Sequence, residues 1–189
     1  QELIHFLERF SRQKETIFLG IGNEGVIELL GFTHHVTNFD TELCFLPVSL
    51  RSFAQSLSFV DQILSEKNLM TVMEIDEVPQ SILFDHTLAD QQKTGKMVDL
   101  LTLIRCGIVC DYPFLQSLYV NFPTSEALLQ QSFSAFSERL INYYQTNSQQ
   151  LNDFGKTFEK AFFQTENGSL LSNSMKTMFG LLFELAWNV

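Results

Sequence analysis

The sequence predicts an α+β protein: a small N-terminal sheet of about three to four strands with flanking helices, followed by a helical bundle of about five helices. Short apolar runs rich in β-branched and aromatic residues, bounded by Gly or Pro, fall before residue 88. From residue 88 onward, apolar residues recur at the 3.6-residue period of a helix. No linker rich in Pro, Gly or Ser divides the two parts. We therefore expect an α/β portion, 1–87, and a helical portion, 88–189, to share one core as a single domain.

The N-terminal elements follow from local spacing. Apolar residues on one helical face predict helices over residues 2–13 and from Leu50 to near Lys67-Asn68, the second introduced by Pro47 and Ser49. Short β-branched and aromatic runs predict strands over Thr16–Gly20, His35–Phe39 and Leu69–Ile75. The run Ile82–Phe84 fits either a strand or a helix.

In the helical portion, apolar periodicity predicts helices over residues 97–109, 114–122, 125–145, 149–164 and 169–187. Thr124, which follows Pro123, is the expected N-cap of the third of these. The polar run Asn147–Gln150 is expected to be a loop between the third and fourth helices.

The last helix is apolar on nearly all faces, so nearly all faces need to be covered. A chain of 189 residues has limited surface with which to enclose such a helix. We therefore expect a homodimer, the commonest soluble oligomer. Its interface would include Met175, Met178, Phe179, Leu182, Phe183 and Trp187.

Composition limits the classes of function. The formal net charge is −10, from 12 Lys and Arg against 22 Asp and Glu, which disfavours nucleic acid and anionic membranes as partners. No apolar run approaches the length needed to span a bilayer, and no signal peptide is evident. Three cysteines without a CxxC pair (Cys44, Cys106 and Cys110) do not form a secreted disulfide framework. These features predict a cytoplasmic, acidic protein.

The stretch "TIFLGIGNEG" carries the spacing Gly20-x-Gly22-x-x-Gly25. From Thr16 to Asp40 it resembles the fingerprint of NAD-binding Rossmann domains and, more loosely, the glycine loop of S-adenosylmethionine methyltransferases. That resemblance implies a βαβ unit with the phosphate at a helix N-terminus. The loop would be formed by Gly20, Gly22, Asn23 and Gly25, and Asp40 would accept the ribose hydroxyls.

A β-hairpin is the competing interpretation of the same residues, and the one that the sequence favours. Asn23-Glu24, flanked by glycines, would turn the chain between strands at Thr16–Ile21 and Val26–Phe32. The crossover helix that a nucleotide loop requires would end before Gly31, after barely two turns. The rest of the chain also lacks a regular alternation of strands and helices.

Other groups capable of chemistry are better explained as structural. His34 and His35 are adjacent, so they would point to opposite faces of the predicted strand and could not readily share a metal. Cys106 and Cys110 share a helical face with aliphatic neighbours, as buried core cysteines do. Glu74, Asp76, Glu77, Asp85 and His86 form an acidic cluster typical of a solvated turn. We therefore predict no catalytic residue and no metal site.

The segment "LYVNFPTSEALLQQSF", Leu118–Phe133, is similar to the stretch of TetR-family regulators in which the recognition helix ends and the next helix begins. The part that would face DNA, Cys110–Asn121, contains Asp111 and neither Lys nor Arg. DNA binding is therefore not expected.

The sequence thus favours a non-catalytic, regulatory module that senses a small-molecule ligand or binds a protein partner, with no cofactor identified. The alternative is a nucleotide- or S-adenosylmethionine-dependent enzyme that uses the Gly20–Gly25 loop. A second alternative is a helical scaffold that associates with copies of itself.

Overall fold

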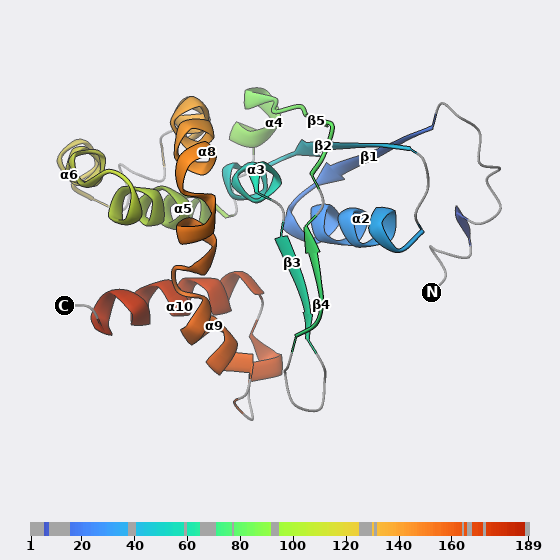
Figure 1. Ribbon diagram of the computed structural model, residues 1–189. Helices are drawn as coiled ribbons and strands as arrows, with labels where there is room; N and C mark the ends of the chain where they lie inside the picture. Colours follow the sequence, from blue (N-terminus) through green and yellow to red (C-terminus); the bar gives the residue numbers. More distant parts are fainter. Residues whose placement is uncertain are drawn as a thin grey trace. The chain divides into compact units, whose positions relative to one another are not determined.

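The computed structural model of the chain contains two compact units, residues 1–91 and 92–189 (Figure 1). The sequence predicts a boundary between the two portions after residue 87. That the two portions share one core remains a prediction. The structure describes residues 6–7, 16–37, 41–58, 60–64, 71–76, 78–91, 95–124, 130, 132–163, 165, 168–171 and 173–187. None of the helices in these ranges has the length and apolarity required to cross a membrane.

The first unit is built on a three-stranded parallel sheet in the order β1-β2-β5. Strand β1 (Ile17–Gly22) pairs with β2 (Glu42–Pro47) over its full length, and β2 pairs with the two-residue β5 (Ser81–Ile82). Helix α2 (Glu24–Thr37) connects β1 to β2. These three elements form a βαβ unit, the arrangement that parallel neighbours require.

The hairpin interpretation is therefore wrong, because Val26–Phe32 lies in α2 and β1 runs parallel to β2. The strand predicted at His35–Phe39 is also wrong, since α2 continues through Gly31 to Thr37 and the second strand begins at Glu42. In the segment Val26–Thr37, apolar residues recur both at the 3.6-residue period of a helix and at the two-residue period of a strand. Its helical period places Ile27, Gly31 and His34 on one buried face, and burial of that face against β1 outweighs the alternation that suggested a strand.

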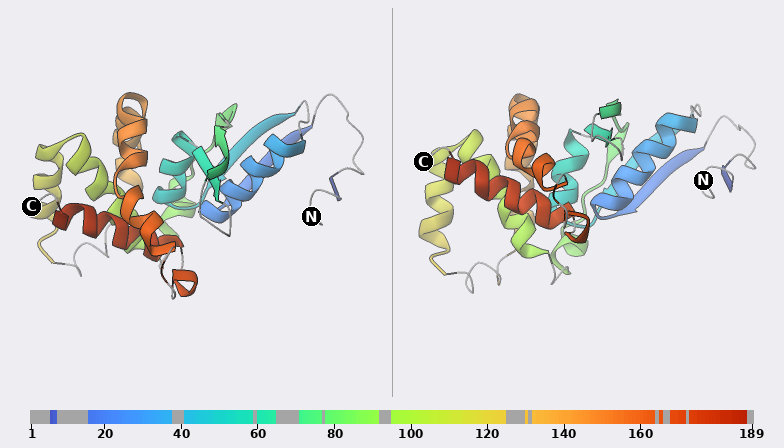
Figure 2. Two further views of the ribbon diagram at one scale, coloured as in Figure 1. Left: turned by 60° about the horizontal axis from the view of Figure 1, so that its bottom comes forward. Right: turned by 90° about the horizontal axis from the view of Figure 1, so that it is seen from below.

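The core of this unit lies between α2 and one face of the sheet (Figure 2). Phe18, Leu43 and Phe45 from the sheet pack with Ile27 from α2 and Ile75 from β4. The opposite face of β1 is open, because its alternate residues Ile17, Leu19 and Ile21 are 60%, 47% and 55% exposed.

Helix α3 (Leu50–Leu57) begins directly after β2. The Ser49 hydroxyl accepts a hydrogen bond from the Ser52 backbone N–H, and the Ser52 hydroxyl pairs with the Ser49 N–H in turn, a capping box that fixes the start of the helix. The helix predicted from Leu50 to near Lys67-Asn68 is wrong beyond Leu57. There β3 (Val60–Leu64) forms an antiparallel pair with β4 (Thr71–Asp76), whose backbone hydrogen bonds replace those of a longer helix. A short helix, α4 (His86–Gln91), ends the unit.

The second unit is helical, which confirms the α+β class. The described part of the whole chain contains eight α-helices, and five of them lie in the second unit, for which the sequence predicts a bundle of about five. Those of this unit, with two 3-10 turns, are α5 (Lys96–Val109), α6 (Tyr112–Asn121), η1 (Ser134–Phe136), α8 (Ser137–Asp153), α9 (Lys156–Phe163), η2 (Gly168–Leu170) and α10 (Asn173–Trp187). Residues 125–129, where the helix after Thr124 was expected to begin, lie outside the described ranges.

The turn between the third and fourth predicted helices lies later in the sequence than predicted. Asn147–Gln150 lies inside α8, with a kink at Asn147 in place of the expected loop. The turn comes at Gly155, whose φ of +84° is a left-handed conformation that favours glycine. A Cβ at Gly155 would lie 3.1 Å from the Leu181 backbone nitrogen, so the glycine also lets α9 lie closely against α10 (Figure 2).

Asp111 links helices α6 and α8 of the second unit. One carboxylate oxygen accepts the Phe114 backbone N–H at 2.9 Å and caps α6, and the other accepts the Tyr143 hydroxyl of α8 at 2.7 Å. The Arg139 guanidinium lies 5.1 Å from the centre of the Phe114 ring. The hydrogen bond from Tyr143, and then that from Phe114, lower the pKa of Asp111.

We expect Tyr143→Phe to destabilise the second unit by about 1 kcal/mol at neutral pH, because it removes a hydrogen bond to a carboxylate. The folded-state pKa of Asp111 lies below its unfolded value, so this stabilisation is present above the unfolded pKa of about 3.9 and is lost as pH falls through the folded pKa. Urea unfolding followed by circular dichroism at pH 7 and near pH 3 would measure both effects.

Tyr119→Phe is the matched control, since Tyr119 is 79% exposed. It should change the free energy of unfolding by less than about 0.5 kcal/mol at either pH. A loss for Tyr143→Phe that stays constant down to pH 3 would contradict the role of Asp111.

Candidate functional site

The carboxyl end of β1 meets the N-terminus of α2 through a single residue, Asn23. The Asn23 carbonyl accepts the backbone N–H groups of Val26 at 3.0 Å and Ile27 at 3.2 Å, which closes the first turn of the helix. The N–H groups of Glu24 and Gly25 have no carbonyl one turn before them, as at any helix start. They carry the positive end of the helix dipole and lie at the sheet edge where α/β proteins bind ligands.

The three glycines of the motif have different structural roles. A Cβ on Gly20 would lie 2.7 Å from Leu30 Cδ2, and a Cβ on Gly22 would lie 2.6 Å from Val26 Cγ2. Both glycines therefore let α2 pack closely on β1. Gly25 is open, with Asn23 Oδ1 at 3.9 Å as the nearest atom. None of the three has a positive φ, so close approach rather than an unusual backbone conformation explains Gly20 and Gly22.

Arg51 supplies a positive charge at this site. Its Nε lies 3.0 Å from Glu24 Oε1, and both side chains are largely buried, so the ion pair joins the first turns of α2 and α3. Arg51 is the sole Lys or Arg among the residues of the first unit that the structure describes. Sequence spacing does not identify Arg51, because its partner Glu24 lies 27 positions earlier in the chain.

The remaining predicted residues are not brought together around this end of the sheet. Asp40 lies outside the described ranges. His34 is buried on α2, where its Nε2 lies 3.0 Å from the Thr41 carbonyl oxygen, whereas His35 is exposed. Within the described ranges, no three His, Cys, Asp or Glu residues are grouped so as to hold a metal ion.

Asp85, one member of the predicted acidic cluster, has a structural role. Its carboxylate accepts the backbone N–H of Thr87 at 2.7 Å and that of Leu88 at 3.2 Å at the start of α4. The hydrogen bonds from Leu88 and then Thr87 lower its pKa. Glu77 and the side chains of Glu74 and Asp76 lie outside what the structure describes.

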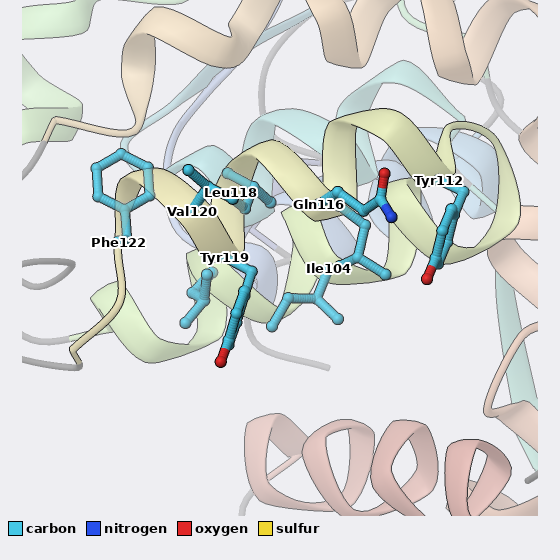
Figure 3. Close-up of a pocket in the computed structure, with 9 residues that line it drawn as sticks. Ile104, Tyr112, Gln116, Leu118, Tyr119, Val120 and Phe122 are labelled. Atoms are coloured by element: carbon cyan, nitrogen blue, oxygen red, sulfur yellow. The ribbon is translucent and has the colours of Figure 1, made fainter.

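A second candidate feature is an apolar groove between α5 and α6, of about 670 Å³ (Figure 3). Tyr112 and Tyr119 project in the same direction from α6, and Ile104 of α5 lies between them. The groove is lined by Leu100, Ile104, Tyr112, Leu115, Gln116, Leu118, Tyr119, Val120 and Phe122. Its volume lies in the range of small-molecule sites.

The predicted interface residues of α10 are divided between packing and exposure. Phe179 contacts Phe162 of α9, with ring centres 5.6 Å apart, and Phe183 stacks on Phe158 at 6.0 Å. Met178 is half-buried, whereas Met175, Leu182, Phe183 and Trp187 are exposed by 42%, 47%, 48% and 79%. One side of the helix thus packs on α9 and another remains open.

No family model matches the chain, and no curated protein sequence matches it. Solved structures with a similar fold do. A 2-epi-5-epi-valiolone synthase from Streptomyces hygroscopicus subsp. jinggangensis, with NAD⁺ and Zn²⁺ bound, is 14% identical with a TM-score of 0.69 over 95% of this chain and 53% of its own. A 2-deoxy-scyllo-inosose synthase with carbaglucose-6-phosphate, NAD⁺ and Co²⁺ is 12% identical with a TM-score of 0.62 over 96% and 53%.

A probable glycerol dehydrogenase from Sinorhizobium meliloti is 11% identical, with a TM-score of 0.56 over 96% of this chain and 58% of its own. The chain therefore spans about half the length of these proteins. At such identities the likeness concerns the fold alone.

We expect Gly22→Ala to destabilise the first unit by about 1–3 kcal/mol, because the new methyl overlaps Val26, whose Cβ would be 2.8 Å away. Gly20→Ala should cost less, since its first contact is the flexible end of the Leu30 side chain. Urea unfolding of each variant would measure the difference.

Val26→Ala in the Gly22→Ala background provides the test of mechanism. If close packing causes the loss, the double variant should recover part of it, and the double-mutant cycle should give a non-zero coupling energy. Additive effects of the two changes would contradict this explanation.

Proposed function

We propose that this chain binds a nucleotide of the NAD⁺ class, with its phosphates at the N-terminus of α2. The observation that carries the proposal is the single-residue passage from β1 to the N-terminus of α2 within a parallel βαβ unit. The site would be formed by Gly20, Gly22, Asn23 and Gly25. The Asp40 carboxylate would accept hydrogen bonds from the ribose hydroxyls. This role is assigned because Asp40 is acidic and lies just before β2 in the sequence.

The backbone and Arg51 share the recognition of the phosphates in this proposal. The N–H groups of Glu24 and Gly25 would donate to a phosphate oxygen, favoured by the helix dipole. The open position at Gly25 lets an anion approach the backbone without meeting a side chain. Arg51 neutralises Glu24, which would otherwise repel the phosphate from the same turn.

The similar structures support the choice of NAD⁺ over other nucleotides. Two of them contain NAD⁺, and they share the fold of this chain at TM-scores of 0.62 and 0.69. S-Adenosylmethionine is the competing ligand, and its carboxylate could occupy the same helix N-terminus. The enzymatic reaction, if this chain contributes to one, would depend on residues beyond this site.

Gly25→Asp tests the position of the phosphate. The added carboxylate lies in the first turn of α2, where a negative charge favours the helix, so the unliganded variant should remain folded. Repulsion of about 1.4 kcal/mol or more would weaken NAD⁺ binding at least about tenfold. Isothermal titration calorimetry with NAD⁺, ATP and S-adenosylmethionine would measure the affinities.

Gly25→Asn is the matched control, because it has nearly the same shape as the aspartate variant without its charge. It should bind NAD⁺ more tightly than Gly25→Asp. Equal NAD⁺ affinities for the two variants would place the phosphates elsewhere. Absence of NAD⁺ binding by the unmodified chain would refute the proposed function.

A non-catalytic interaction module is the second candidate function, favoured by the uncharged groove between α5 and α6 and the open side of α10. In this proposal a second copy of the chain covers the exposed apolar residues of α10, among them Leu182 and Trp187. Leu182→Glu should convert the resulting homodimer to a folded monomer in sedimentation velocity, because burial of a carboxylate in the interface is unfavourable. A monomeric unmodified chain at micromolar concentration would exclude this homodimer.

A further inference from the structure

We infer that the nucleotide affinity of this chain is independent of any bound divalent transition metal, in contrast to the metal-containing state of the similar synthases. The inference rests on the proposed function, because it concerns how the proposed nucleotide is held. Two of the similar structures contain Co²⁺ or Zn²⁺ together with NAD⁺. Among the residues of the helical unit that the structure describes, the donor groups do not fit such an ion.

Imidazole, the commonest ligand for such metals, is missing from the second unit. Residues 92–189 contain no histidine, since the four histidines of the chain are His5, His34, His35 and His86. Of these, His34 lies against the Thr41 carbonyl and the Phe18 ring, both within the first unit. A metal in the helical unit would therefore depend on thiolates and carboxylates.

The two cysteines of α5 are poor metal donors. They lie one helical turn apart, a spacing that suits two ligands of one ion. Burial raises the pKa of Cys106 to about 12, and burial also raises the pKa of Cys110. Because zinc and cobalt bind the thiolate, an ion here would first have to remove protons that the surroundings hold firmly.

The carboxylates of the helical unit that the structure describes are committed to other groups where their contacts are known. Asp111 caps α6 and accepts the Tyr143 hydroxyl, and Glu159 of α9 accepts the Thr177 hydroxyl at 3.0 Å. Lys176, 5% exposed on α10, and Arg105, half-buried on α5, add positive charge to this unit.

Metal content and nucleotide affinity give two independent readouts. The purified chain is incubated with ZnCl₂ or CoCl₂, dialysed without chelator, and analysed by inductively coupled plasma mass spectrometry. We expect far less than one ion per chain. The NAD⁺ dissociation constants measured by calorimetry with and without EDTA should then agree within about twofold, which is the reproducibility of measured free energies.

A variant carrying Glu138→His and Asn142→His provides the positive control. Both residues are exposed on α8 and lie one turn apart, so the paired imidazoles should retain Zn²⁺ and show that the assay detects a bound ion. Cys106→Ser with Cys110→Ser tests the thiols. Retention of one ion by the unmodified chain and its loss in the double-serine variant would overturn the inference and identify the ligands.

The outcomes separate this inference from the proposed function. NAD⁺ binding without metal supports both. If EDTA weakens NAD⁺ binding at least tenfold, or if Zn²⁺ or Co²⁺ strengthens it as much, the inference of metal independence is wrong. The proposed nucleotide site is still supported by that result. Failure to bind NAD⁺ with or without added metal refutes the nucleotide proposal, and the inference falls with it.

Discussion

The close packing of α2 on β1 is the constraint on which the first unit depends. Gly20 and Gly22 remove the two side chains that would hold the helix away from the strand. The helix can then start one residue after β1, cover Phe18 and return the chain to pair β2 parallel to β1 over six positions. The same contact places the N-terminus of α2 at the carboxyl end of the sheet. A packing requirement and a candidate binding site thus arise from the same short segment.

The overall charge of the first unit opposes an anionic ligand, and the local field favours one. Residues 1–91 contain five Lys and Arg against fourteen Asp and Glu, a net charge of −9. At physiological ionic strength, exposed charges are screened over about 8 Å, so distant carboxylates contribute little at the site. The start of α2 carries about half a positive charge, and the Arg51 guanidinium, 3.0 Å from Glu24, neutralises the carboxylate in the same turn. We therefore expect the local groups to determine affinity, and the net charge to slow association.

The sequence predicted the fold class and the positions of most helices, because helical periodicity is a local signal. It predicted α5 and α6 to within two residues at each end. It failed between Val26 and Thr37, where helical and alternating patterns coexist and where long-range pairing with β2 decides the outcome. The glycine spacing was recognised, but the roles of Gly20 and Gly22 depend on Leu30 and Val26, which lie across a helix–strand contact that spacing alone does not reveal. Arg51 was missed for the same reason, since its partner Glu24 lies 27 positions earlier.

In each unit a small number of close contacts constrains the packing of the fold. Packing fixes a fold through a limited set of positions, such as the glycines beneath α2 and Gly155 against α10, and these tolerate wide variation elsewhere. A metal site needs several donors with the right protonation state at the same place, so a few substitutions remove it without cost to the fold. A phosphate site built from backbone N–H groups needs fewer specific side chains and is harder to lose. At 11–14% identity the similarity to the solved structures concerns the fold alone, so the proposed NAD⁺ site depends on the geometry of β1 and α2 in this chain.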